Sequence, residues 1–339
     1  MKKLFPQTKM LQEAKAQSKG HFFIIELLIF IVVLLVAEII SSLPVLAIEI
    51  VDMLSNERVM EAVRLMQSGD ITYQEYTSMI SETVKSGSVV LPSLFVTGIV
   101  TLVIFIYCRF IEKRKLSTLG FRKKDFIAEY GVGMLIGTLM FSAAVGICVF
   151  TGALSGGIAD NIRWGMIGLF FVGFLIQGMS EEVMCRGYLM VSISRRSHIA
   201  LAVALSSLVF GALHLGNNSF TVLAFINISL FGLFEALYIL KRGNIWGVCG
   251  IHSLWNFVQG NFYGISVSGF DEVDSVFKMS SVESKTLMNG GGFGLEGGLA
   301  VTIVLVICIV LITLTKTKYS ELAEELPDAA EESVPAAAE

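Results

Sequence analysis

The sequence has few charged residues for its length. Of its 339 residues, 16% are Asp, Glu, Lys or Arg and 54% are hydrophobic, whereas a typical soluble domain is about 25% charged. This balance excludes a disordered or collagen-like chain. It also indicates a membrane protein rather than the two soluble domains that the length alone suggests.

Paired cysteines are also missing. The five cysteines stand singly in apolar stretches with no Cys-x-x-Cys pair, so they indicate small core residues rather than a disulfide scaffold. The sequence contains no HExxH zinc motif, no internal repeat and no matched pair of broken apolar segments of the inverted-repeat transporter kind.

An excess of negative charge is absent outside one end of the chain. Seven acidic residues follow Lys318, and without them 29 acidic residues become 22, against 25 basic ones. The net charge of −4 therefore belongs to the Ala-, Glu- and Pro-rich segment 318–339, which we predict to be a disordered tail. We expect no nucleic-acid partner.

Long apolar runs are the main feature that is present. The first run follows a lysine-rich start, is too long for a signal peptide and has no small-residue cleavage site, so we expect it to be retained. We predict an all-α polytopic membrane protein with eight transmembrane helices in one bundle. The predicted spans are 22–48, 89–110, 127–152, 164–190, 199–215, 219–240, 244–262 and 297–315.

Basic residues predict the orientation of this bundle. With eight spans, every Lys/Arg cluster falls on the side of both termini, whereas the 49–85 loop holds seven acidic and three basic residues. The positive-inside rule then predicts a protein of the cytoplasmic (cell) membrane with both termini in the cytoplasm. Helical spacing of apolar residues in the 49–88 loop predicts an amphipathic helix outside the bilayer, with Met60, Val63, Leu65 and Met66 on its apolar side.

Ionisable residues inside a span are unfavourable and are therefore candidates for function. Glu182 and Arg186 are four residues apart, so we expect them to share a helix face as an ion pair, with Glu181 turned about 100° away. A rise of about 1.5 Å per residue allows three spans to bring their polar residues together within the bilayer. The set is Glu181, Glu182 and Arg186 in the fourth span, His214 in the fifth, and His252 and Asn256 in the seventh.

These residue types suit the hydrolysis of a peptide bond. Glu181 is the expected general base on water and His214 the group that holds this water. His252 and Asn256 are the expected donors to the oxyanion. Alternatively, Glu181, His214 and His252 bind Zn²⁺ with one open position, although Asn256 is a poor zinc ligand and the set requires no cofactor.

Other polar residues in or near the spans have simpler interpretations. We expect Glu235, which lies near Lys241, and also Glu26 and Glu38, to reach the membrane interface or to pair there. Cys185 has no histidine at helical spacing and is a weak candidate nucleophile.

The three polar segments resemble the motifs of the CAAX-protease and bacteriocin-processing (CPBP) family of intramembrane proteases, which includes the CAAX prenyl endopeptidase and lysostaphin-resistance-protein-A-like members. The resemblance covers about 160–262. It implies an all-helical membrane endopeptidase, glutamate- or metal-dependent, with catalytic roles on Glu181, His214, His252 and Asn256 and supporting roles on Glu182, Arg186 and Phe210. The motifs are EExxxR at 181–186, FxxxH at 210–214 and HxxxN at 252–256.

We therefore expect an intramembrane endopeptidase that cleaves a small peptide or a membrane-associated protein in a cavity open to the cytoplasm. Its expected partners are that substrate and the lipid bilayer. A non-catalytic scaffold or bacteriocin-immunity protein that binds a peptide or membrane partner is the alternative, and an ion-coupled transporter is a third. The predicted segments are N-terminal helices with an outer loop (1–159), the protease core (160–262), a second outer loop with the last helix (263–317) and the tail (318–339).

Overall fold

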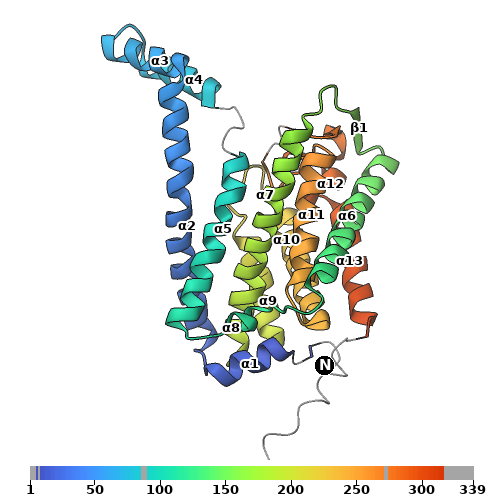
Figure 1. Cartoon of the computed structure of the whole chain (residues 1–339). Helices are drawn as coiled ribbons and strands as arrows, with labels where there is room; N and C mark the ends of the chain where they lie inside the picture. Colours follow the sequence, from blue (N-terminus) through green and yellow to red (C-terminus); the bar gives the residue numbers. More distant parts are fainter. Residues whose placement is uncertain (1–4, 7, 85–89, 271–273, 317–339) are drawn as a thin grey trace, which may run out of the picture.

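The protein is a bundle of helices that lie roughly along one axis (Figure 1). The computed structural model describes residues 5–6, 8–84, 90–270 and 274–316. Helices account for most of these residues, so the predicted all-α polytopic architecture is confirmed. The tail predicted at 318–339 lies outside the described residues.

A helix occurs at each of the eight predicted spans. Among the described residues, five helices are long and apolar enough to cross a membrane, namely α2, α5, α6, α7 and α10 with their continuations. The helices α9, α11 and α13 are shorter, so the count of eight crossings stays a prediction. The bounds are α2 Phe23–Ser55, α5 Val90–Ile106 continued by η1 Tyr107–Ile111, α6 Phe126–Phe150, α7 Trp164–Glu182 continued by η3 Val183–Met190 and α8 Val191–Ser194, α9 Ile199–Ala212, α10 Val222–Arg242, α11 Trp246–Phe257 continued by η4 Val258–Phe262, and α13 Leu299–Leu314.

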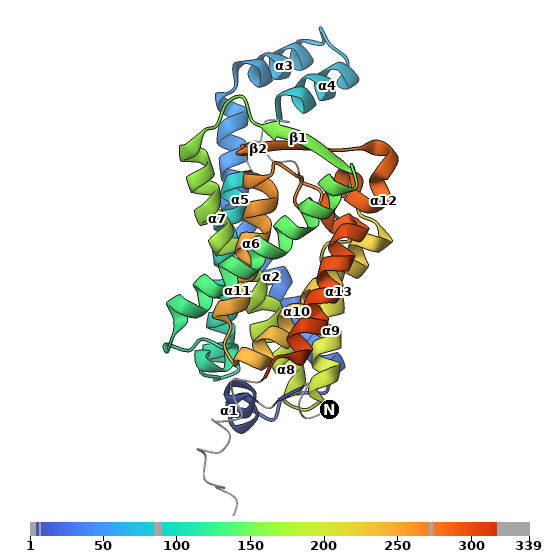
Figure 2. The ribbon, with the colours of Figure 1, turned by 90° about the vertical axis from the view of Figure 1, so that its right-hand side faces the viewer.

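The two ends of the bundle differ in structure. The helix α1 (Lys9–Gln17), α8 and the C-terminal end of α13 lie at one end, which we call the basic end because the Lys/Arg clusters are there (Figure 1). The opposite end carries α3 (Glu57–Ser68), α4 (Tyr73–Val84), α12 (Thr286–Asn289) and a two-stranded sheet (Figure 2). A helix, α3, occurs in the 49–88 loop as predicted, but it buries Val59 and Ala62 rather than the predicted apolar side of Met60, Val63, Leu65 and Met66.

The sheet was not predicted. Strand β1 (Leu154–Ile158) pairs antiparallel with β2 (Phe277–Ser281), so that Leu154 lies opposite Ser281 and Ile158 opposite Phe277. It joins two loops that are far apart in the sequence and closes over the end of the bundle opposite the basic end (Figure 2).

A buried ion-pair network closes the basic end. Arg195 Nη2 lies 3.0 Å from Glu26 Oε1 and 2.6 Å from Glu112 Oε1, and Arg114 Nε lies 2.8 Å from Glu112 Oε2. The network ties the start of α2 to the end of α8 and to the segment after η1. Because all four side chains are nearly inaccessible, each charge has its partner inside the protein. The expected pairing of Glu26 is thus observed.

Glycines allow α11 to pack closely against α6 and α7. A Cβ atom at Gly178 of α7 would lie 2.6 Å from the backbone nitrogen of Ser253, and Gly133 and Gly137 of α6 face the α11 backbone in the same way. Such close approach is possible only for small residues. It places α11 in the middle of the bundle, next to the end of α7.

The positions of the two ends generate a prediction about sidedness. If the basic end faces the cytoplasm, a cysteine in place of Ser155, exposed in β1, reacts with a membrane-impermeant maleimide added to intact cells. A cysteine in place of the exposed Lys123 reacts only after the cells are permeabilised. The unmodified chain, whose five cysteines are buried or half-buried, is the blank. The reverse labelling pattern would refute the orientation.

Candidate active site

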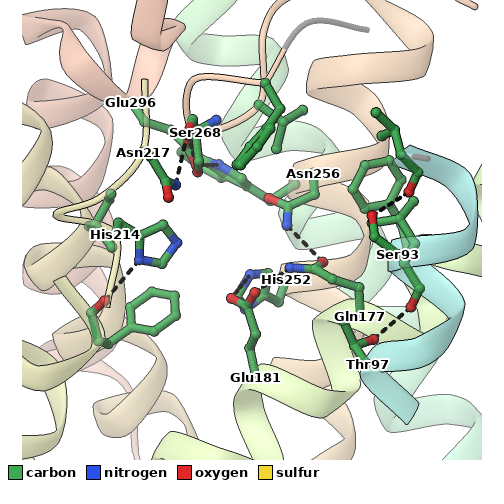
Figure 3. Close-up of a pocket in the computed structure, with 18 of the residues that line it drawn as sticks. Ser93, Thr97, Gln177, Glu181, His214, Asn217, His252, Asn256, Ser268 and Glu296 are labelled. Atoms are coloured by element: carbon green, nitrogen blue, oxygen red, sulfur yellow. Dashed lines mark hydrogen bonds and ion pairs between the residues drawn. The ribbon is translucent and has the colours of Figure 1, made fainter. Parts of the chain in front are cut away.

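The three motifs meet where α7 ends and η3 begins. His252 of α11 places its Nδ1 atom 2.8 Å from Glu182 Oε1 and its Nε2 atom 3.4 Å from Glu181 Oε2. The side chain of His252 is 3% exposed and that of Glu182 is fully buried, whereas that of Glu181 is 24% exposed. One imidazole therefore lies between a buried carboxylate and one that faces a cavity. Figure 3 shows Glu181 and His252 at this cavity.

Arg186 holds two buried carboxylates. Its Nη1 atom lies 3.0 Å from Glu182 Oε1, as the four-residue spacing predicted, and its Nη2 atom lies 2.7 Å from Glu235 Oε2. The helix continues after Glu182 with the wider π-helical turns of η3, a local distortion that is frequent at functional sites. Phe210 covers the guanidinium, with its ring centroid 4.2 Å from Arg186 Cζ.

The expectation for Glu235 was wrong. Glu235 is fully buried at Arg186 and lies 3.6 Å from His252 Nδ1, whereas Lys241 donates to the carbonyl of Thr315 at 2.8 Å. Gly232, one turn earlier on α10, provides the space, because a Cβ atom there would lie 2.7 Å from Arg186 Nη2. The sequence shows only that Glu235 lies on an apolar helix. Which side of that helix faces Arg186 depends on the rotation of α10, which hydropathy does not specify.

His214 lies across the cavity from Glu181 and His252 (Figure 3). Its Nδ1 atom lies 2.9 Å from the carbonyl oxygen of Phe210. Since a carbonyl only accepts, Nδ1 carries the proton, and in the neutral imidazole Nε2 is an acceptor. The ring of Phe210 contacts both histidines, with centroid distances of 5.1 Å to His214 and 5.7 Å to His252.

Gln177 is a site residue that sequence reasoning missed. Its Nε2 atom donates to Glu181 Oε1 at 2.5 Å, and its Oε1 atom accepts from Asn256 Nδ2 at 3.0 Å. Gln177 thus connects the expected base to one of the expected oxyanion donors. Asn256 keeps a second N–H on its amide nitrogen. The available signal was a polar side chain one helical turn before Glu181 on an otherwise apolar face.

The residues predicted to bind zinc are not gathered into a metal site. Among the described residues, the only set whose ligand atoms all lie within 4.8 Å of one another is Glu182, Glu235 and His252. Arg186 already contacts both carboxylates of this set, so the guanidinium takes the place that a cation would need. The arrangement therefore does not fit a zinc ion bound by Glu181, His214 and His252.

A cavity of about 600 Å³ lies in front of Glu181 and His252. Its walls come from α2, α5, α7, α9, α10, α11 and α13, and from loops at the sheet end through Asn217, Ser268 and Glu296. It does not extend toward the basic end, where residues 182–195 are all buried. Packed η3 and α8 thus close the side of the basic end, and the expected opening of the cavity to the cytoplasm stays a prediction.

Glu38 of α2 also lines this cavity. The cavity face of α2 is formed by residues 38, 41, 42 and 45, which recur with helical spacing, and Glu38 lies near enough to Glu181 for their charges to interact. Glu38 was expected at the membrane interface, and this expectation was wrong as well. Its position 15 residues after the start of α2 corresponds to about 22 Å along the helix axis, inside a hydrocarbon core of about 30 Å.

The buried cluster generates a prediction about stability. Replacing Arg186 by Met leaves two buried carboxylates without their cation, and we expect the protein to lose about 3–5 kcal/mol of stability. Thermal unfolding in detergent micelles measures the loss as a lower midpoint. Arg196→Met removes an exposed arginine from the same region and should change stability by less than about 0.5 kcal/mol. Equal midpoints for the two variants would contradict the role of Arg186.

Comparison with known proteins agrees with the three motifs. Residues 163–258 match the model of a family described as Type II CAAX prenyl endopeptidase Rce1-like. No curated protein and no solved structure matched the chain. The matched residues begin just before α7 and end just after α11, so they include all three motifs and the residues around Arg186. The region from 163 to 258 is accordingly similar to the Rce1-like CAAX endopeptidases.

Proposed function

We propose that this protein is an intramembrane endopeptidase in which Glu181 activates water. The observation that carries the proposal is the row Glu182–His252–Glu181, in which a buried carboxylate orients an imidazole beside a second carboxylate that faces a cavity. CAAX-type protease activity is what the family match suggests for this region. The substrate is a small peptide or a segment of a membrane-associated protein.

The cavity-facing groups provide each proton transfer of the reaction. Water donates one proton to Glu181 and its oxygen attacks the carbonyl carbon of the scissile bond. His214 Nε2 accepts a hydrogen bond from this water, because its Nδ1–H is held by the Phe210 carbonyl. When the tetrahedral intermediate collapses, Glu181 returns the proton to the leaving amine nitrogen. No proton is lost or gained over the cycle.

Two donors stabilise the oxyanion of the intermediate. The free N–H of Asn256 is one, and Gln177 fixes the orientation of this amide. The other is the Nε2 atom of His252, which donates as N–H, while Nδ1 of the same ring lies 2.8 Å from Glu182 Oε1.

Catalysis by Glu181 is testable by an isosteric replacement. Glu181→Gln keeps the side-chain shape but removes the base, so we expect kcat to fall about 100- to 10,000-fold. Purified wild type and variant are incubated with candidate peptides, and the products are quantified by mass spectrometry. Glu283→Gln, which alters an exposed glutamate at the sheet end, is the matched control and should retain full activity. Undiminished cleavage by Glu181→Gln would refute the mechanism and leave the non-catalytic alternative.

Gln177 is a positioning residue in this mechanism. Gln177→Met keeps the length of the side chain but removes the hydrogen bonds to Glu181 and Asn256, which are each worth about 1 kcal/mol. We expect kcat to fall about tenfold or more while KM and the unfolding midpoint stay nearly constant. Ser93→Ala is the control, since Ser93 lines the same cavity but bonds only its own helix. A change confined to KM would place Gln177 in substrate binding instead.

A further inference from the structure

The cavity in front of Glu181 is acidic. Three carboxylates line it, those of Glu38, Glu181 and Glu296, and within the described part of the chain no Lys or Arg side chain does. Most of its other lining residues are apolar or uncharged. The negative charge of this cavity therefore comes from glutamates, and the lining side chains that can oppose it are the imidazoles of His214 and His252.

Glu296 has a structural explanation. Its Oε2 atom accepts from the backbone N–H of Ser268 at 2.9 Å and from the Ser268 hydroxyl at 2.7 Å, and its Oε1 atom accepts from Trp255 Nε1 at 3.2 Å. Gln259 Nε2 lies 3.4 Å from Oε2. These donors attach the loop around Ser268 to α11. The carboxylate is satisfied by the protein itself.

Glu38 and Glu181 have fewer donors, since Ser41 hydrogen-bonds Glu38 and Gln177 donates to Glu181 Oε1. Of the residues that the structure describes, no Lys or Arg forms an ion pair with either of them. The Oε2 atom of Glu181 is buried, forms no hydrogen bond and lies 3.4 Å from His252 Nε2. Two carboxylates that interact across a low-dielectric cavity repel each other, and each is unfavourable inside a bilayer unless a cation or water compensates it.

We infer that the cavity recognises a cationic group of the substrate next to the scissile bond, with Glu38 as the residue that selects it. The inference rests on the proposed function and names its substrate class. A positive group placed between Glu38 and Glu181 removes the repulsion between them. A free C-terminal carboxylate placed between the same two glutamates would be repelled by both. The cationic group is a Lys or Arg side chain or an N-terminal ammonium, since the three share this chemistry.

The walls of the cavity indicate what surrounds that cationic group. Leu94, Phe174, Ile228, Phe231 and Leu305 line it together with the glutamates. Apolar walls with a few placed polar groups are the usual design of a selective pocket. The expected substrate segment is therefore apolar with one positive charge near the cleaved bond.

Paired peptides test the inference. The probes are short fluorescein-labelled peptides of Leu and Val with one central variable residue, Lys, norleucine or Asp, each with a free or an acetylated N-terminus. We expect wild type to cleave the Lys peptide at least about tenfold more efficiently, as kcat/KM, than the norleucine peptide. Glu38→Gln should reduce this ratio to about one, and Glu38→Lys should favour the Asp peptide. If acetylation removes the preference, the recognised cation is the N-terminal ammonium.

Glu49→Gln is the matched control, because Glu49 lies on the same helix but outside the cavity lining. A preference for Lys that persists in Glu38→Gln, or no preference in wild type, would overturn the inference. Fluorescence anisotropy of the same peptides in detergent micelles measures binding and so tests the inference separately from the proposed function. Binding of the Lys peptide that depends on Glu38 without any cleavage supports the inference and refutes the proposed function. Absence of both binding and cleavage refutes both.

Discussion

The double ion pair of Arg186 is the interaction on which the site depends. One guanidinium contacts Glu182 of α7 and Glu235 of α10, and Phe210 of α9 covers it. Charges in a bilayer are tolerated when each is paired, and removing one partner leaves the others uncompensated. Because Glu182 also bonds His252 of α11, the same pair sets the direction of the imidazole. Four helices are thus held in register by one side chain.

Small residues make this arrangement possible. Gly232 leaves room for the guanidinium and Gly178 allows the backbone of α11 to approach α7. A larger side chain at either position would push the helices apart and lengthen these contacts beyond hydrogen-bond distance. The polar contacts and the glycines are therefore two parts of one constraint, since short ionic contacts between helices require short distances between their backbones.

The sequence predicted what depends on spacing along one helix and missed what depends on contacts between helices. The pairing of Glu182 with Arg186 follows from four residues on a helix, and the motif residues of α7 and α11 lie together as expected. Glu235 and Glu38 were misplaced because hydropathy does not report how α10 and α2 are rotated. The sheet of β1 and β2 was missed because its strands come from two distant loops.

The closed basic end changes how a substrate reaches the site. Residues 182–195 are buried, so neither water nor peptide approaches Glu181 along η3 and α8. The cavity instead extends toward the loops at the sheet end and along the face of α2 that carries Glu38. In the proposed function, a peptide that enters from the sheet end passes the carboxylate of Glu38 before it reaches Glu181. An acidic approach attracts positive segments before the chemistry begins. If Glu38 selects the substrate as we infer, the same charge also directs its entry.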